Sequence, residues 1–385
     1  MNKARVIAFY LPQYHPTPEN DKMWGKGFTE WTNVVKAKPL YRGHYQPQIP
    51  ADLGFYDLRV PEVRIEQAKL AKEAGIEGFC YWHYWFGNGR RILDRPFREV
   101  LESGEPDYPF CLGWANHSWS NKTWQKSKHF TKDVTFIEQT YPGEEDYINH
   151  FSTVLKAFKD RRYITVDGKP LFLVFDPEAI PDTEMFVGIW QRLARRNGLP
   201  GIYFVARLSA CDKLSLKHGL DYTSNIEERY QRYLDCGYDA INSDMQMYAE
   251  ISVSGAAKRI ARAGMRKLFG NVTAYKYDYS EIMAHFHHPI ETREDVHPQI
   301  IPRLDRTPRS GKDARIYDGS TPELFGRAVD DALDIVKDKP YEKRIIFLQA
   351  WNEWGEGNYM EPDLRFGHGY LDALRSHISE GGKQK

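Results

Sequence analysis

The chain has 385 residues, and its 53 Lys and Arg balance its 53 Asp and Glu, so the formal net charge is zero. This balance gives no polybasic footprint for nucleic acid or for anionic lipid as a charge-driven partner. Hydrophobic residues make up 41% of the chain, and the charges are interspersed, which excludes disorder over most of the length. We therefore expect a folded globular protein with no nucleic-acid partner.

The N-terminal apolar run, residues 6–11, is too short for the apolar region of a signal peptide, and no run approaches the length of a membrane span. The four cysteines lie far apart with no CxxC spacing, which favours reduced core thiols over a disulfide framework or a zinc site. We therefore expect a cytoplasmic protein without a membrane span. The cysteines are Cys80, Cys111, Cys211 and Cys236.

Short apolar runs alternate with amphipathic segments along the whole chain. Eight strand-then-helix units favour a parallel sheet, and the count fits a closed (β/α)8 TIM barrel better than an open sheet. No GxGxxG follows a strand, which weakens a nucleotide-binding doubly wound alternative. The expected strands are 5–11, 76–82, 109–114, 170–175, 201–206, 222–226, 299–302 and 344–350. The expected helices are 60–74, 92–101, 144–158, 183–197, 240–268, 321–336 and 369–379.

We expect a single barrel domain over residues 1–385, with a frayed tail at 380–385. Three long irregular stretches, 12–58, 115–142 and 271–320, are rich in Trp, Tyr, His, Asn, Pro and Gly. In a barrel such loops stand over the C-terminal face, where active sites are built.

Aromatic residues make up 14% of the chain, with 24 Tyr, 20 Phe and 10 Trp. A large aromatic core accounts for most of the Phe. Trp and Tyr beside Asn, His and Asp at strand ends suit sugars, because C–H faces of sugars pack on rings while their hydroxyls need polar partners.

The segment after the last expected strand, AWNEWGEGNY at 350–359, carries Glu353 and Glu356 three positions apart. Gly355 and Gly357 allow a sharp turn, so both carboxylates can converge on one cavity. Glycoside hydrolysis usually needs such a pair, and close like charges tend to raise the pKa of one member. The alternatives are a solvated turn with a helix cap and, more weakly, a calcium loop. The strand-end position, the neighbouring aromatics and the lack of an adjacent Lys or Arg favour the catalytic pair.

Other strand ends supply residues of the types that contact sugars. Three histidines, His15, His83 and His117, lie at these ends, but none has HxH or HExxH spacing, so we expect no catalytic metal and no cofactor. The expected substrate-binding residues are Tyr10, His83, Tyr84, Trp85, Asn116, His117, Trp119, Asp176, Arg207, Trp351, Asn352 and Trp354.

Several blocks together resemble the WbsX-type proteins, also described as glycoside hydrolase family 99-like domains. The blocks are residues 9–59, GFCYWHYWF at 78–86, DGKPLFLVFDP at 167–177 and WNEWGEGNYMEP at 351–362, and the resemblance runs from about residue 5 to residue 370. It implies a (β/α)8 barrel, an association with bacterial O-antigen, lipopolysaccharide and other surface-polysaccharide biosynthesis, and kinship with endo-acting α-mannosidases.

The resemblance also implies roles for individual residues. Glu353 would take the proton of the sugar 2-hydroxyl to form a 1,2-anhydro sugar, and Glu356 would be the general acid and later the base, so the reaction would be retaining. Tyr10 is similar to a tyrosine of the family's site.

The chain also departs from the family pattern. His117 stands where the family usually has an acid. Leu304 and Arg306 replace a Trp and an Asn of a GWDNTPR motif in which Asp305, an expected sugar contact, and Arg309 remain. The resemblance therefore does not imply α-mannoside specificity.

Together these observations favour a glycosidase or transglycosylase acting on a bacterial surface polysaccharide or its lipid-linked precursor. Two alternatives stay open: a glycosyltransferase of polysaccharide biosynthesis, and a non-catalytic glycan-binding barrel. The expected partner is an oligosaccharide or polysaccharide; the sugar, the linkage and the oligomeric state do not follow from the sequence.

Overall fold

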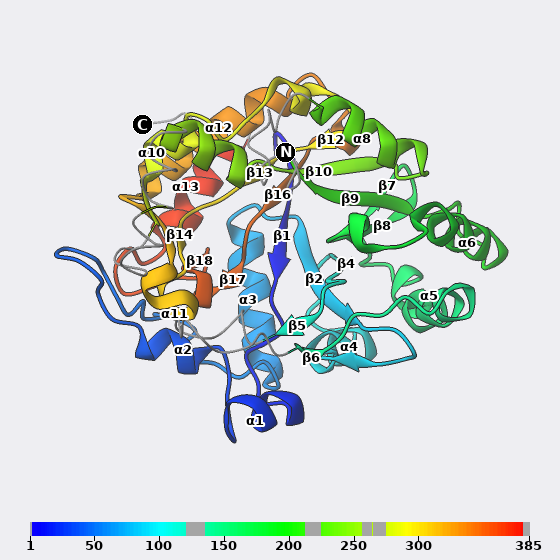
Figure 1. The fold of residues 1–385 in the computed structure, drawn as a ribbon, viewed down its shortest axis with the longest axis horizontal. Helices are drawn as coiled ribbons and strands as arrows, with labels where there is room; N and C mark the ends of the chain where they lie inside the picture. The colour runs from blue at the N-terminus through cyan, green and yellow to red at the C-terminus, as the bar shows by residue number, and fades with distance from the viewer. Residues whose placement is uncertain (1, 121–134, 212–224, 256–263, 265–274, 380–385) are drawn as a thin grey trace.

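The computed structural model describes residues 2–120, 135–211, 225–255, 264 and 275–379. Its main sheet runs in the order β12, β10, β9, β8, β4, β2, β1, β16, β13, with every neighbouring pair parallel (Figure 1). Only Pro298 separates β12 from β13, so these two pieces form one interrupted strand that joins both ends of the sheet. The strands therefore make a nearly closed barrel, and the predicted TIM barrel is confirmed.

The barrel strands are buried on both faces, which is why they appear in the sequence as nearly continuous apolar runs. Strand β1 lies between β16 and β2, with Arg5 beside Ile345 and Ile7 beside Gly78. A Cβ at Gly78 would lie 2.3 Å from the Pro109 carbonyl oxygen, so only glycine fits there. The strands are β1 (Arg5–Tyr10), β2 (Gly78–Trp85), β4 (Phe110–Trp114), β8 (Lys169–Val174), β9 (Tyr203–Ser209), β10 (Ala240–Asp244), β12 (Val296–His297), β13 (Gln299–Ile300) and β16 (Ile345–Leu348).

Helices surround the barrel: α5, α6 and α8 lie outside β8 and β9, and α12 and α13 lie on the other side of the molecule (Figure 1). Proline in the first turn begins both α3 and α12, where its missing N–H costs nothing. The longer helices are α3 (Pro61–Glu73), α4 (Arg95–Ser103), α5 (Glu144–Phe158), α6 (Thr183–Arg196), α8 (Ile226–Asp235), α12 (Pro322–Val336) and α13 (Gly369–Ile378). No helix within these described ranges is long and apolar enough to cross a bilayer.

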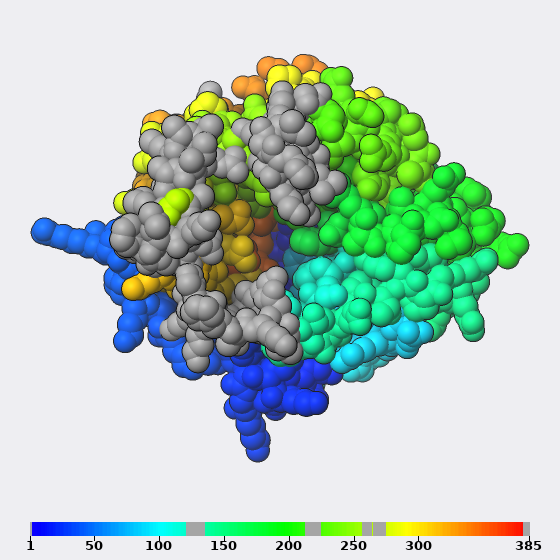
Figure 2. Space-filling view, in the orientation of Figure 1, coloured from blue at the N-terminus to red at the C-terminus, as the bar shows by residue number. Residues whose placement is uncertain are grey.

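Shorter elements build the loops over the carboxyl ends of the strands. The short helices are α1 (Pro18–Trp24), α2 (Trp31–Lys36), α10 (Tyr279–Met283) and α11 (Thr307–Ser310). The short strands are β3 (Arg91–Ile92), β5 (Trp119–Ser120), β6 (Thr135–Ile137), β7 (Thr165–Val166), β11 (Tyr275–Asp278), β14 (Leu304–Asp305), β15 (Arg315–Asp318), β17 (Asn352–Glu353) and β18 (Asn358–Tyr359). Figure 2 shows the molecule hollowed near its centre, where segments from both the early and the late parts of the chain are visible.

The sixth unit differs from the prediction. A strand was expected at 222–226 and a helix at 240–268, but α8 begins at Ile226 and the sixth barrel strand is β10. The expected helix is present only from residue 246, and it is described as far as residue 255; residues 222–224, 256–263 and 265–268 lie outside the described residues. The polar residues Asn242, Ser243 and Asp244 hid this strand, although Asn242 and Ser243 are fully buried. Ser243 shares a hydrogen bond with the Tyr230 hydroxyl at 2.9 Å. The other expected strands and helices lie within three residues of their predicted bounds.

Candidate active site

A cavity of about 330 Å³ lies at the carboxyl ends of the barrel strands. Its wall includes residues from β1, β2, β9, β10 and the segment that follows β16. This is the end of a TIM barrel where catalytic residues are found. The cavity is therefore the candidate active site.

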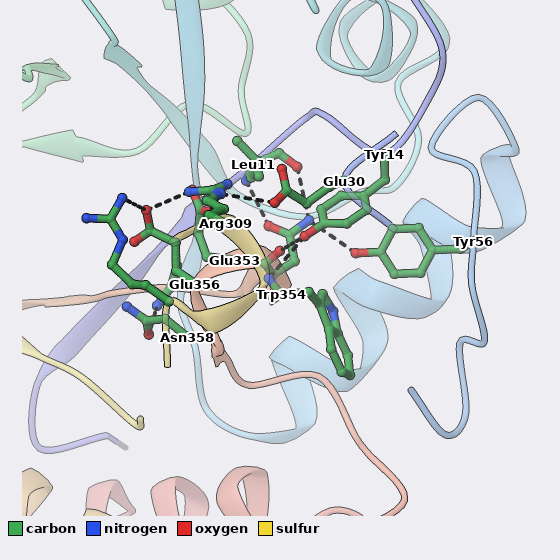
Figure 3. Close-up of polar contacts among 12 residues, drawn as sticks. Leu11, Tyr14, Glu30, Tyr56, Arg309, Glu353, Trp354, Glu356 and Asn358 are labelled. Carbon is green, nitrogen blue, oxygen red and sulfur yellow. Dashed lines mark hydrogen bonds and ion pairs between the residues drawn. The ribbon is translucent and has the colours of Figure 1, made fainter. Parts of the chain in front are cut away.

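Glu353 and Glu356 both line this cavity, exposing 14% and 17% of their side chains. One guanidinium joins them: Arg309 donates from Nη2 to Glu353 Oε2 at 2.7 Å and from Nη1 to Glu356 Oε1 at 2.6 Å (Figure 3). The two carboxylates are therefore no further apart than one guanidinium and two hydrogen bonds. The structure brings the predicted pair together.

The pair is also held by cations that the sequence analysis did not assign to it. Arg309 and Arg306 belong to the segment around α11, more than forty residues before the glutamates. Arg306 Nη2 lies 3.0 Å from Glu356 Oε1. The sequence analysis found no Lys or Arg adjacent to the pair in the sequence, but in the folded structure two arginines contact it. The site is therefore an ion-pair network rather than two free carboxylates.

A third carboxylate lies behind the pair. Arg309 Nε donates to Glu30 Oε1 at 3.0 Å, and Glu30 is fully buried (Figure 3). A Cβ on Gly355 would lie 1.6 Å from the same Glu30 oxygen. The glycine between the two glutamates is therefore required because the Glu30 carboxylate approaches the backbone there.

The turn that carries the pair is fixed by buried hydrogen bonds. The Tyr14 hydroxyl donates to the Asn352 carbonyl oxygen at 2.6 Å and accepts from the Trp354 backbone N–H at 3.0 Å. The Asn358 side chain accepts from the Ala350 backbone N–H at 2.9 Å. Because these groups are buried, the turn has few alternative conformations available.

The environment drives the pKa values of the two glutamates apart. Burial raises the pKa of Glu353 to about 7; Arg309 opposes this shift, and Glu356 and Glu30 add to it. Burial would also raise the pKa of Glu356, but Arg306, Arg309 and Arg315 outweigh it and hold this pKa at about 2. One carboxyl of the pair thus keeps its proton near neutral pH while the other is ionised.

Aromatic rings form much of the remaining wall. Phe9 and Trp82 stack with ring centroids 4.7 Å apart, and Trp82 meets Phe175 edge to face at 5.5 Å. Tyr84 and Trp119 make a second edge-to-face pair at 5.4 Å. All five rings line the cavity, so it offers both apolar faces and charged groups, as sugars require.

Polar residues complete the wall on the side of β9 and β10. Arg207 donates to Asp244 at 2.8 Å and lies over the Phe175 ring at 4.9 Å. Burial, together with the Arg207 cation, lowers the pKa of His117 to about 4, so this imidazole is neutral near pH 7. In the described part of the chain, no group of three His, Cys, Asp or Glu side chains could hold a metal ion.

The predicted site residues divide into two sets. Those that line the cavity are Tyr84, His117, Trp119, Arg207, Glu353 and Glu356. Asp176 lines an adjacent compartment of about 190 Å³ that shares Phe175, Arg207 and Asp244 with the cavity. Those that the structure places outside both linings are Tyr10, His83, Trp85, Asn116, Asp305, Trp351, Asn352 and Trp354.

Strand alternation explains the position of Tyr10. Successive side chains of a strand point to opposite faces, and in β1 it is Phe9 that reaches the cavity, with Leu11 following it. The Tyr10 hydroxyl instead donates to Gln67 Oε1 of α3 at 2.7 Å. A direct contact between Tyr10 and a sugar would require the Tyr10 side chain to line the cavity. Its neighbours Phe9 and Leu11 line the cavity instead.

His83 and Trp85 likewise point to the helix side of β2. His83 Nε2 lies 2.9 Å from His150 Nε2, and Trp85 Nε1 donates to Asp146 at 2.9 Å. These contacts bind β2 to α5. Both residues were predicted as sugar contacts, and both occupy supporting positions.

Asn352, Trp354 and Trp351 are buried beneath the turn. The Asn352 side chain accepts from the Leu11 N–H at 2.8 Å and donates to the Leu11 carbonyl oxygen at 3.0 Å. Trp354 Nε1 donates to Glu361 at 2.6 Å, and Trp351 is fully buried. These residues hold the turn that presents the glutamates, and their side chains do not reach the cavity wall.

Asn116 and Asp305 are buried within the loops. Asn116 donates to the Asp176 carbonyl oxygen at 2.7 Å. Asp305 accepts from Gln46 at 2.6 Å and lies 2.7 Å from the His44 ring nitrogen. Their hydrogen bonds join separate loops to one another, which again places them in support of the cavity.

Several lining residues were missed by the sequence analysis. Phe9 and Trp82 lie one position away from residues that were chosen, and counting alternation along each strand would have found them. Asp244 was missed because the sixth strand was misplaced. The other missed residues include Gln13, Gln246, Arg306, Arg315 and Gln349, for which the sequence carried no local signal.

Solved structures of similar fold are glycoside hydrolase-like barrels. A glycoside hydrolase-like protein superposes with a TM-score of 0.59 at 14% identity, covering 99% of this chain and 95% of the other. A family GH99 endo-α-mannosidase from Bacteroides thetaiotaomicron, in complex with bis-tris-propane, superposes with a TM-score of 0.53 at 13% identity, covering 97% and 95%. These likenesses show the fold.

Related sequences indicate the family. The chain is 34% identical over 382 residues to the uncharacterized protein WxcX of Xanthomonas campestris pv. campestris, in strain B100 and in strain ATCC 33913. The match covers 98% of this chain and 50% of WxcX, so the chain spans about half the length of these relatives. The family model described as glycosyltransferase WbsX matches residues 6–374. The chain therefore belongs to the WbsX family.

Proposed function

We propose that the chain is an enzyme that breaks or transfers glycosidic bonds of a bacterial surface polysaccharide or of its precursor, with Glu353 and Glu356 as its catalytic pair. The observation that carries this proposal is the pair itself: two carboxyl groups on one turn, joined by one guanidinium in an aromatic-walled cavity. The barrel fold and the WbsX membership support it.

The chemistry asks for two different carboxyl groups. Cleavage of a glycosidic bond needs a proton for the leaving oxygen and a negative charge near the anomeric carbon, where positive charge develops. A carboxyl with a pKa of about 7 supplies the first near neutral pH, and a carboxylate with a pKa of about 2 supplies the second.

The charges of the site favour Glu353 as the proton donor. Glu356 lies within 3.0 Å of both Arg306 and Arg309, whereas Arg309 is the only described arginine that pairs with Glu353, so the negative charge of the pair is better stabilised on Glu356. We therefore assign Glu356 to electrostatic stabilisation of the oxocarbenium-like transition state. This assignment reverses the roles that the family resemblance implies, because the 1,2-anhydro route needs a proton on Glu356.

Substitution of each glutamate tests the proposal. Glu353→Gln and Glu356→Gln should each lower turnover of a cleavable surface glycan at least about a hundredfold, as loss of an acid or a charge at the reacting centre does. Glu62→Gln is the matched control, because Glu62 is an exposed residue of α3 that does not line the cavity. Unchanged turnover in either site variant would reject the catalytic pair.

Transfer from a nucleotide sugar is the second candidate, favoured by the description of the family as glycosyltransferases. Calorimetric titration with nucleotide sugars distinguishes a transferase from a hydrolase. Saturable binding of a nucleotide sugar followed by sugar transfer favours the transferase. Cleavage of glycan without nucleotide-sugar binding favours the hydrolase. A non-catalytic barrel would bind glycan with both glutamates replaced and would show no turnover in either assay.

A further inference from the structure

Three arginines of the cavity wall use few of their hydrogen-bond donors. A guanidinium carries five N–H donors in a fixed fork. Among the described residues, Arg207 uses only Nη2, to Asp244 at 2.8 Å and to Gln349 at 3.4 Å. Its Nε is buried and has no partner. The Arg207 fork is therefore only partly occupied by the protein.

Arg306 and Arg315 have even fewer contacts. Arg315 donates from Nη1 alone, to Glu250 at 3.1 Å. Arg306 is 3.0 Å from Glu356 as an ion pair, and its side chain donates no hydrogen bond within the ranges that the structure describes. Both side chains remain partly exposed, at 32% for Arg315 and 27% for Arg306. Part of each side chain is therefore open to solvent, although Arg306 Nε is itself buried.

These arginines lie close together. The Arg306 N–H donates to the Arg315 carbonyl oxygen at 3.0 Å, across the ladder of β14 and β15. Arg207 and Arg315 both line the adjacent compartment as well as the cavity, and Asp244 interacts electrostatically with Arg315. Arg207 and Arg315 thus lie where the two compartments join, and Arg306 lies beside Arg315 in the main cavity.

Two titratable groups respond to a positive potential at this place. Burial is the main reason that His117 has a low pKa, and Arg207 adds to the effect. At Glu356, Arg306, Arg309 and Arg315 overcome a burial effect of opposite sign. Both shifts therefore report arginine guanidinium groups close to His117 and to Glu356.

We propose that the sugar bound in this cavity carries a carboxylate, as a uronic acid does, and that Arg207, Arg306 and Arg315 bind that group. This inference rests on the proposed function, because it names the sugar class of the same site. Arginine forks match carboxylate geometry with two parallel hydrogen bonds. A phosphate offers similar oxygens, but Asp244 and Glu356 line the same cavity and repel a dianion more strongly than a monoanion.

The aromatic wall orients such a sugar. Phe175 lies under the Arg207 guanidinium and beside Trp82, so the aromatic wall and the arginines adjoin each other. The glutamate pair lines the same cavity. An acidic sugar can therefore reach the charged side while its glycosidic bond faces Glu353 and Glu356.

Binding is measured by the fluorescence of Trp82 and Trp119, which line the cavity. The probes at pH 7 are the methyl glycosides of glucuronic and galacturonic acid, the neutral methyl glucoside and methyl galactoside, and glucose 1-phosphate. We expect at least one uronate to bind about tenfold or more tightly than its neutral counterpart, since charge-assisted hydrogen bonds are the strong ones. Added salt should reduce this preference.

Variants test the arginines directly. Arg207→Gln with Arg315→Gln should bring the uronate and its neutral counterpart to within about twofold of each other. Arg293→Gln is the matched control. Arg293 pairs with Asp295 at 2.8 Å, the same distance as the Arg207–Asp244 pair, but Arg293 does not line the cavity. The double change Arg207→Gln, Asp244→Asn leaves no unpaired carboxylate, and its circular dichroism shows whether a loss of binding reflects unfolding.

Equal affinity for uronates and neutral glycosides, or no uronate binding, overturns the inference. If glucose 1-phosphate binds more tightly than the uronates, the proposal of a sugar carboxylate is wrong and the arginines bind a phosphate instead. The catalytic proposal is tested separately. A preference for uronates without glycan turnover would support the carboxylate site and reject the proposed enzyme activity. Turnover of a neutral glycan without a preference for uronates would support the enzyme activity and reject the carboxylate site.

Discussion

Substitution of Gly355 by alanine tests the network that holds the glutamate pair. The added Cβ would lie 1.6 Å from Glu30 Oε1, 2.6 Å from Glu30 Cδ and 2.9 Å from Arg309 Nε. Glu30 is fully buried, and Arg309 Nε holds its carboxylate at 3.0 Å. The clash is therefore relieved only when Glu30 moves away from Arg309.

The expected cost follows from that separation. Breaking a buried ion pair costs about 3–5 kcal/mol, and the lower entropy of alanine in the unfolded chain returns at most about 1 kcal/mol. We expect Gly355→Ala to lower the free energy of unfolding by about 2–4 kcal/mol. Activity should fall as well, because Arg309 also holds Glu353 and Glu356.

Urea unfolding followed by tryptophan fluorescence and by circular dichroism measures this change. Gly188→Ala is the matched control: it lies in α6, and its Cβ would meet nothing nearer than Arg192 Nη1 at 3.7 Å. In a Glu30→Ala background, Gly355→Ala should cost less than about 1 kcal/mol, because the two nearest clashing atoms belong to Glu30 and are gone. A Gly355→Ala protein as stable as the original, or an equal cost in both backgrounds, would refute the reasoning.

Three further predictions concern protonation and burial. If Glu353 is the proton donor, kcat/KM should fall as pH rises above about 7, because Glu353 loses its proton there. A kcat/KM that rises above pH 7 would instead assign the role of proton donor to Glu356. Tyr10→Phe removes only the buried hydrogen bond to Gln67, so unfolding in urea should show a loss of about 1 kcal/mol while glycan affinity stays within about twofold; a tenfold weaker affinity would place Tyr10 at the cavity. Burial raises the pKa of Glu361 to about 7, above its unfolded value, so its contribution to stability is present at acid pH and is lost as pH rises through about 7. Glu361→Gln should remove this decline in the free energy of unfolding, and parallel pH curves for both proteins would contradict it.

Most of the barrel could be predicted because its strands are buried on both faces. The runs that became β1, β4, β8 and β16 are apolar almost throughout, and each is followed by a segment of helical period. The sixth strand could not be found this way, since Asn242, Ser243 and Asp244 are polar and are accommodated by tertiary contacts. A hydrogen bond such as that of Tyr230 to Ser243 has no local signature in the sequence.

The candidate site was predictable where chemistry is local in the sequence. The turn with Glu353 and Glu356 carries its glycines and aromatics within ten residues. Glu30 could not be assigned to the pair, because it reaches Arg309 across 279 residues. Tyr10 was chosen by residue type at a strand end, whereas the pleat of the strand decides which side chain faces inward.

The two sides of the network come from segments that meet only in the finished barrel. Leu11 and Asn352, which exchange backbone and side-chain hydrogen bonds, are 341 residues apart in the sequence. Until β1 pairs with β16, Glu30 is not in place to hold Arg309 beside the glutamates, and Phe9 does not line the cavity. The candidate site is therefore complete only when the first and last strands of the barrel are paired.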